Sequence, residues 1–217
     1  MIEFKDIGFS YDEKTLLQHV DFTLNDGEFI GILGPNGGGK STFLKLVLGI
    51  VRPLGGTRKV TDTNIGYLAQ NNGIGDRGFQ CTVEEFVGLG LIRGKKWFLN
   101  RKDRALVKKT LQGYGIYDLR KHLLNSLSGG QLQRARLAKT LISDPSLVIF
   151  DEPDAGMDEE SHHRMIHIIE SLHEQGKSIL FVSHHPHDLE HADRVYYIDN
   201  GEISLYTHGK EGHHVSL

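Results

Sequence analysis

The stretch that most constrains the fold is a glycine-rich loop between an apolar run and a helical pattern. Residues 29–33 read as a buried strand, and residues 41–48 have the apolar spacing of a helix. Between them the chain follows the pattern of a glycine, four further residues and Gly-Lys-Ser. The loop comprises Gly34, Pro35, Asn36, Gly37, Gly38, Gly39, Lys40, Ser41 and Thr42. This pattern in this context predicts a phosphate-binding loop.

The residue types of the loop suit a nucleoside triphosphate. Glycines let backbone N–H groups converge on phosphate oxygens, and a helix N-terminus adds partial positive charge. We expect Lys40 to neutralise the β- and γ-phosphates and the Ser41 hydroxyl to bind Mg²⁺. The structural alternative is a glycine-rich turn with a solvated lysine, which the strand–loop–helix context disfavours.

Two carboxylates follow a second apolar run. Residues 147–150 form a continuous apolar stretch, and Asp151 and Glu152 come directly after it. Ligands of open α/β sheets bind at the carboxyl ends of the strands. We therefore expect Asp151 to hold magnesium and Glu152 to act as the general base on the attacking water. A solvated acidic turn is the alternative, and the phosphate loop argues against it.

The order of patterns predicts an α/β fold in one domain of residues 1–217. Short β patterns fill residues 2–33, and residues 65–69 read as a further strand. Residues 71–143 carry helical patterns at 83–91, 104–111 and 130–142, followed by a helix over 158–174. We expect residues 1–70 and 144–217 to form the nucleotide-binding core and residues 71–143 an inserted helical subdomain. A hairpin is expected around Asn200–Gly201, and the tail after Tyr206 should be loosely ordered.

Composition excludes several classes of protein. The chain has 25 basic and 28 acidic side chains, so charge gives no reason to expect a nucleic-acid partner. No run approaches the ~20 apolar residues of a membrane helix. The first residues lack the pattern of an export signal, and a single cysteine, Cys81, fits a reducing cytosol. Any role at a membrane is expected to depend on partner proteins.

A third motif lies before the helix over 130–142. Leu127-Ser128-Gly129-Gly130-Gln131 reads as a helix N-cap with exposed backbone N–H groups. It suits either a second anion site or a plain capped helix, and local physics does not choose between them. Here the chain resembles the ATP-binding-cassette ATPases, whose signature loop reads Leu-Ser-Gly-Gly-Gln. The resemblance covers nearly the whole chain.

The resemblance implies a fold and further site residues. The fold would be a P-loop NTPase (RecA-like) core with an N-terminal antiparallel β subdomain and an inserted α-helical subdomain. Tyr11 looks like the aromatic residue that stacks on adenine. Gln70 resembles the glutamine of the loop that joins the core to the helical subdomain, a magnesium ligand and catalytic residue. Asp158 ends a loop that runs along the dimer interface, and His184 resembles the histidine that contacts the γ-phosphate.

The resemblance also implies a mechanism with two copies of the chain. They would enclose two ATP molecules, and Ser128, Gly129, Gly130 and Gln131 of one copy would meet the γ-phosphate held by Lys40 of the other. Hydrolysis would then open the pair. The implied partners are ATP, a second copy or a paralogue, an integral membrane permease and, indirectly, an extracytoplasmic solute-binding protein. The chain would lie at the cytoplasmic face of the membrane.

The cargo is harder to infer from sequence. Residues 82–91, 94–99 and 117–120 look like those of zinc and manganese uptake ATPases. An importer for another cargo remains open, as does a soluble ATPase of the same fold that regulates iron–sulfur or cell-division assemblies. A non-hydrolysing regulator is a third alternative, against which Glu152 and His184 argue.

Several residues depart from common patterns. Gly38 stands where many members of the family have alanine or serine, and Asp154 and Met157 are also unusual. The 13 histidines are expected to be mostly solvated rather than metal ligands. We expect Trp97 and Phe98 to pack locally in preference to contacting a membrane.

Overall fold

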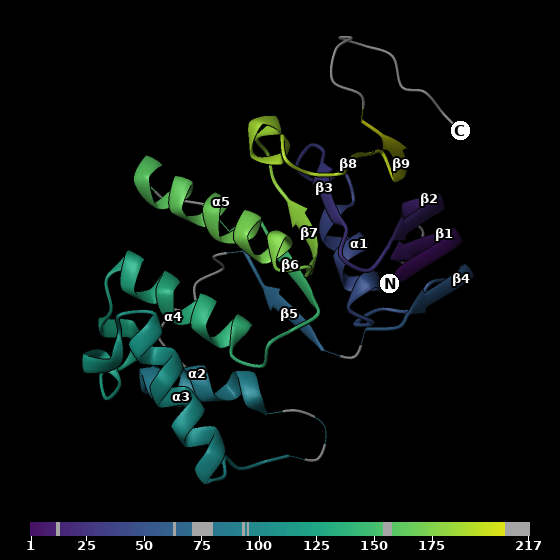
Figure 1. The fold of residues 1–217 in the computed structure, drawn as a ribbon. Coiled ribbons are helices and arrows are strands. Elements are labelled where there is room, and N and C mark those ends of the chain that lie inside the picture. The colour runs from purple at the N-terminus through teal and green to yellow at the C-terminus, as the bar shows by residue number, and fades with distance from the viewer. Residues whose placement is uncertain are drawn as a thin grey trace.

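The computed structural model describes residues 1–11, 14–62, 64–70, 80–92, 94, 96–153 and 158–206. Its centre is a six-stranded sheet in the order β5-β6-β7-β3-β8-β9 (Figure 1). The strands from β5 to β8 run parallel, and β9 pairs antiparallel with β8. The strands are β3 (Phe29–Leu33), β5 (Ile65–Leu68), β6 (Leu147–Asp151), β7 (Ser178–Val182), β8 (Arg194–Asp199) and β9 (Glu202–Leu205).

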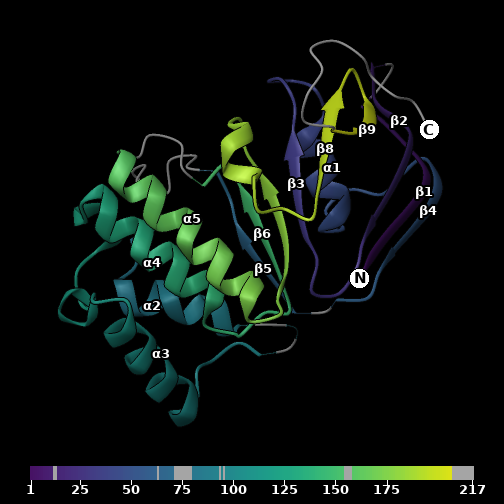
Figure 2. The same ribbon diagram turned by 45° about the horizontal axis from the view of Figure 1, so that its top comes forward.

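Both faces of this sheet are covered. Ile30 and Ile32 belong to a core shared with α1 (Lys40–Val47) and a second sheet. Phe29 and Leu33 belong to a different core, shared with α4 (Gly129–Leu141) and α5 (Glu159–Glu174). Figure 2 shows α1 on one side of the sheet and α4 and α5 on the other. Because each central strand is buried on both faces, β3, the first four residues of β6 and the last four of β7 read as apolar runs.

The second sheet is antiparallel, in the order β2-β1-β4. Its strands are β1 (Ile2–Tyr11), β2 (Lys14–Leu24) and β4 (Gly55–Val60). It confirms the expected antiparallel β subdomain, although β1 and β2 are longer than the sequence pattern indicated. The strand β4 was not anticipated, because it lies at the sheet edge and is largely exposed, so it carries no apolar alternation.

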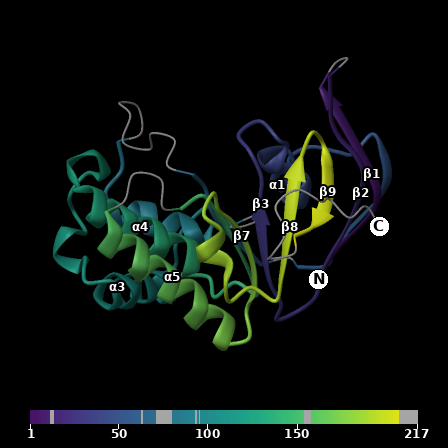
Figure 3. The same cartoon turned by 90° about the horizontal axis from the view of Figure 1, so that it is seen from above.

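The helical block has its own core. It contains α2 (Val83–Gly88), η1 (Leu89–Leu91), α3 (Arg101–Gly113), η2 (Tyr117–Leu119), η3 (Leu124–Ser126) and α4. Apolar residues of α2, α3 and α4 form a third hydrophobic cluster. Thr82, Asn100 and Ser128 each begin a helix with a capping box, which explains why α3 starts before the apolar pattern at 104. Figure 3 shows these helices at one end of the molecule and the second sheet at the other.

Trp97 and Phe98 do not pack locally. They are 79% and 87% exposed, so the expectation of a packed aromatic pair is wrong. They lie in the segment before α3, where neither side chain is covered by a neighbouring element. Within the described residues no helix combines the length and the apolar character needed to cross a bilayer.

Candidate nucleotide site

The glycine-rich loop joins β3 to α1, as expected. Gly34 has a φ of 146°, and a Cβ at this position would lie 2.0 Å from the carbonyl oxygen of Ile198. The backbone conformation and the neighbouring strand β8 therefore both require glycine here. The helix starts at Lys40, and its N-cap Gly39 supplies no side-chain hydrogen bond. The first N–H groups of α1 are thus left without a side-chain cap, as an anion-binding helix end requires.

The structure explains why position 38 is a glycine. A Cβ on this residue would lie 2.8 Å from the Ile198 carbonyl oxygen and 3.2 Å from that of Pro35. The Gly38 N–H donates to the same Pro35 carbonyl at 3.1 Å, so the loop is folded tightly against β8. An alanine or serine here would require the loop or β8 to shift.

Lys40 is buried within the loop. Its Nζ donates to the carbonyl oxygens of Gly34 at 2.8 Å and Pro35 at 3.1 Å, and lies 3.5 Å from Glu152 Oε1. The loop's own backbone thus holds the ammonium group at the carboxyl end of the sheet. A buried cation in this position suits a polyanionic ligand.

Glu152 is the meeting point of the predicted catalytic residues. The Gln70 amide donates from Nε2 to Glu152 Oε2 at 2.7 Å, and His184 Nε2 lies 2.6 Å from the same oxygen. Lys40, Gln70, Glu152 and His184 are named here the Glu152 cluster. Glu152 itself is buried and has a φ of 44°, and its N–H donates to Val182 of β7. An unusual backbone conformation fixed by a neighbouring strand points this carboxylate to the phosphate loop.

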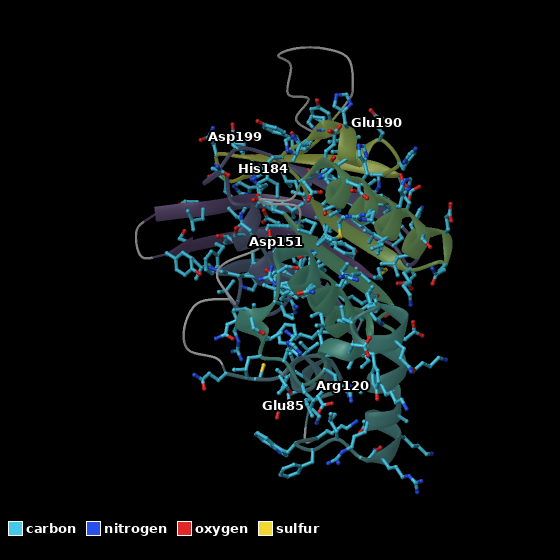
Figure 4. The ribbon with its side chains drawn as sticks, turned by 90° about the vertical axis from the view of Figure 1, so that its left-hand side faces the viewer. Glu85, Arg120, Asp151, His184, Glu190 and Asp199 are labelled. Atoms are coloured by element: carbon cyan, nitrogen blue, oxygen red, sulfur yellow. The ribbon has the colours of Figure 1, made fainter. Side chains whose placement is uncertain are left out.

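Asp151 ends β6 and directly precedes Glu152; Figure 4 labels it together with His184. Burial raises the pKa of the Asp151 carboxyl, and the Glu152 charge adds to this, while a hydrogen bond from Tyr67 and the Lys40 charge oppose it. Tyr67 donates its hydroxyl to Asp151 Oδ2 at 2.8 Å. Burial and the Asp151 charge raise the pKa of Tyr67, so the phenol stays protonated and remains a donor.

Sequence reasoning missed Tyr67. The residue lies on β5, which pairs with β6, and its register partner is Ile149, two residues before Asp151. A polar side chain next to the acidic strand end was a usable signal, but only if β5 and β6 were known to be neighbours.

The oxygen donors of the site fit a magnesium ion. Ser41 offers a hydroxyl, Asp151 a carboxylate, and Gln70 an amide oxygen, since its Nε2 is used by Glu152. Mg²⁺ prefers such hard oxygen ligands. The burial of the Asp151 carboxylate is a further reason for a cation, because a nearby positive charge would offset the cost of burying its negative one.

The histidines of the described residues form no group suited to a metal ion. In the described ranges no set of three or more His, Cys, Asp or Glu side chains is placed to hold a metal ion. His208, His213 and His214 lie outside the described residues.

The signature loop lies apart from the phosphate loop. Ser128 caps α4, accepting from the Gln131 N–H at 3.4 Å, and the Ser128 N–H donates to Gln131 Oε1 at 2.9 Å. A Cβ on Gly129 or Gly130 would meet nothing within 4 Å. The helices α4 and α1 cover opposite faces of the central sheet. Ser128, Gly129 and Gly130 are exposed, so this helix end is open to another molecule.

Two other predicted residues also lie outside the Glu152 cluster. Tyr11 ends β1, is 45% exposed and packs edge-on against Phe9. Asp158 caps α5, accepting the Ser161 N–H at 2.8 Å, and is exposed. Residues 154–157, which include Asp154 and Met157, lie outside the described residues.

Comparison with known proteins agrees with this geometry. A family model described as ABC transporter matches residues 17–155. The chain belongs to the ABC transporter family. It is accordingly an ATP-binding-cassette ATPase, and its fold, with a P-loop core and inserted helices, is confirmed by solved ABC cassettes.

The relatives of this ABC cassette include metal transport proteins. The zinc transport system ATP-binding protein AdcC of Streptococcus pneumoniae is 35% identical, with 98% of each chain covered. The manganese transport system ATP-binding protein MntB of Halalkalibacterium halodurans is 34% identical, over 90% of this chain and 80% of that one. A metal-chelate type ABC transporter in an inward-facing conformation has a TM-score of 0.82, at 27% identity, and covers 94% of this chain and 82% of its own.

Tyr67→Phe should weaken the Asp151 end of the ABC cassette. Losing one hydrogen bond to a charged group is expected to lower the free energy of unfolding by about 1–3 kcal/mol. The ATP hydrolysis rate should fall most at limiting Mg²⁺, because Asp151 is left less firmly oriented. Urea unfolding and Mg²⁺ titrations of the ATPase rate check this. The matched control is Tyr114→Phe, a half-buried tyrosine that lines a pocket with Asp144 and Lys177, just before the starts of β6 and β7. Equal effects of the two changes would contradict the prediction.

Proposed function

We propose that this ABC cassette hydrolyses ATP to drive the uptake of zinc or manganese through a membrane permease. The observation that carries the catalytic part is the convergence of Lys40, Gln70 and His184 on the buried Glu152 carboxylate. We also propose that residues 1–217 act as one domain, with the core in 1–70 and 144–217 and the helical subdomain in 71–143.

Each residue of the Glu152 cluster has a proposed role. Glu152 accepts a proton from the attacking water, and its buried position directly after β6 keeps it facing the phosphate loop. His184 holds Glu152 and contacts the γ-phosphate. Lys40 leaves the loop carbonyls to neutralise the β- and γ-phosphates, while the backbone N–H groups of residues 34–42 bind the phosphate oxygens. Tyr11 stacks on the adenine.

Ser41, Gln70 and Asp151 are the proposed magnesium ligands. The bound ion would supply positive charge to the phosphate oxygens. Tyr67 keeps the Asp151 carboxylate in one orientation. Gln70 contacts Glu152 as well, so it links the proposed magnesium ligands to the Glu152 cluster.

The second half of each site is proposed to come from another copy or a paralogue. The open end of α4, with Ser128, Gly129, Gly130 and Gln131, would bind the γ-phosphate held by the partner's phosphate loop. Asp158, at the start of α5, would lie along the same interface. A complete site would therefore exist only in the dimer.

The cargo is proposed from the relatives. AdcC is named as a zinc transport protein and MntB as a manganese transport protein. These names favour transport over the regulation of a soluble assembly. An extracytoplasmic solute-binding protein would then deliver the metal to the permease, and the cassette would lie at the cytoplasmic face.

A groove in the helical block is the proposed permease site. It encloses about 850 Å³ and is lined by apolar side chains such as Leu89, Trp97 and Phe98, with charged groups around them. Glu85 and Arg120, labelled in Figure 4, are among these charged groups and lie far from Asp151 and His184. Two largely exposed aromatic residues beside a groove suit a protein partner.

Metal-stimulated hydrolysis in the assembled transporter tests this function. With the permease in lipid and the solute-binding protein present, zinc or manganese should raise the ATPase rate severalfold over the metal-free rate. Trp97→Ser with Phe98→Ser should abolish the stimulation and keep the basal rate, because these residues lie away from the nucleotide site. Stimulation by an organic solute alone would contradict the proposed metal cargo. If the cassette binds only a soluble scaffold protein, the regulatory alternative is favoured.

A further inference from the structure

A buried carboxylate lies just beyond the Glu152 cluster. Asp188, in η4 (Pro186–Leu189), is 8% exposed, and both of its carboxylate oxygens have partners. Oδ2 accepts the hydroxyl of Ser183 at 2.6 Å, and Oδ1 lies 2.8 Å from His162 Nε2. A buried charge with partners on both oxygens joins the segments that supply those partners.

Ser183 ties this carboxylate to the residues around His184. It follows β7, is fully buried, and its N–H donates to Ile32 of β3. Its Oγ donates to Asp188 and accepts the N–H of His185 at 3.0 Å. The hydroxyl of Ser183, the residue before His184, therefore also holds the backbone of His185, the residue after it.

His162 ties the same carboxylate to α5. Its N–H donates to the carbonyl of the helix cap Asp158, so it lies in the first turns of the helix. Its side chain is 24% exposed, whereas that of the next residue, His163, is 67% exposed. The ring of His185 lies edge-on to that of His162, with centroids 6.2 Å apart.

We propose that Ser183, Asp188 and His162 form a positioning network that joins the end of β7 to the start of α5 and so holds His184 against Glu152. The network rests on the proposed catalytic roles of Glu152 and His184. Glu152 directly follows β6, and His184 comes two residues after β7. The Ser183 hydroxyl holds the backbone around His184, and the contact of Asp188 with His162 braces this turn against α5. A turn held in this way keeps His184 Nε2 at 2.6 Å from Glu152 Oε2. Small displacements of positioned groups lower rates strongly.

The steady-state ATPase of the full chain tests the network. His162→Leu should lower kcat by about tenfold while the KM for ATP stays within about twofold. His162→Gln should restore most of the rate, because the glutamine Nε2 can donate to Asp188 from nearly the same place. His163→Leu, an exposed neighbour, is the matched control and should keep the rate. A Gln variant as slow as the Leu variant, a loss confined to KM, or an unchanged rate in His162→Leu would overturn the proposal.

Three further variants complete the test. Asp188→Asn should act like His162→Leu, and the double variant should be no slower than the slower single one, because both break one network. If Asp188→Asn does not fold, the His162 series decides alone, with thermal unfolding showing that its members are folded. Glu152→Gln in the same assay separates the two ideas. If Glu152→Gln stops turnover while His162→Leu does not, only the positioning network is rejected. If Glu152→Gln turns over normally, both the network and the catalytic role of Glu152 are rejected.

Discussion

Glu152→Gln is expected to lower the ATP turnover number by at least about a hundredfold, because the group that accepts the proton from water is gone. Glutamine has the same shape, so contacts with Gln70 and His184 can be kept in part. Nucleotide affinity should be unchanged or higher, since a negative charge 3.5 Å from Lys40 is removed from the phosphate site. A variant that binds ATP without hydrolysing it should accumulate as the ATP-bound dimer.

Single-turnover hydrolysis, nucleotide binding and light scattering measure these effects. Glu202→Gln, an exposed carboxylate on β9, is the control and should behave as the unaltered chain. Turnover at the normal rate in Glu152→Gln would remove this residue from its catalytic role. A variant that binds nucleotide and Mg²⁺ yet stays monomeric would contradict the proposed site shared between two copies.

Gly34→Ala is expected to have the largest effect on stability. A Cβ at 2.0 Å from the Ile198 carbonyl cannot be accommodated without moving β8 or the loop, and the φ of 146° is itself unfavourable for alanine. Together these costs should lower the free energy of unfolding by about 2–5 kcal/mol. ATP binding should be lost with the loop geometry.

Gly37→Ala is the matched control. Gly37 has a φ of 81°, but an added Cβ would meet nothing within 4 Å, so only backbone strain of about 1–2 kcal/mol is expected. Urea unfolding of both variants measures the difference. If Gly34→Ala is no less stable than Gly37→Ala, the close approach of the loop to β8 does not matter for folding.

Much of the local structure could be predicted from sequence. The strand over 29–33, the loop after it and the helices from 83 onwards follow from apolar spacing, glycines and capping residues. These signals act over a few residues, so they are readable without the fold. The two features that the sequence did not predict lack such local signals. The edge strand β4 has no apolar alternation, and the exposed aromatic pair at 97 and 98 gave no local sign of its exposure.

The arrangement of the site needed the tertiary structure. Gln70 is 82 residues from Glu152, and Tyr67 is 84 residues from Asp151. These pairs meet because β5 lies beside β6, and strand order depends on packing of the whole chain. The hydrogen bond from Tyr67 and the link from His162 to Asp188 could therefore not be predicted from the sequence alone.

The sequence by itself therefore determined the phosphate loop, the acidic strand end, the capped signature helix and the family they indicate, because each depends on residues adjacent in the chain. The tertiary structure alone decided that Lys40, Gln70 and His184 meet at one buried carboxylate, and that Asp188 joins α5 to the end of β7. Such contacts depend on which distant strands become neighbours, and that follows from burying both faces of one sheet.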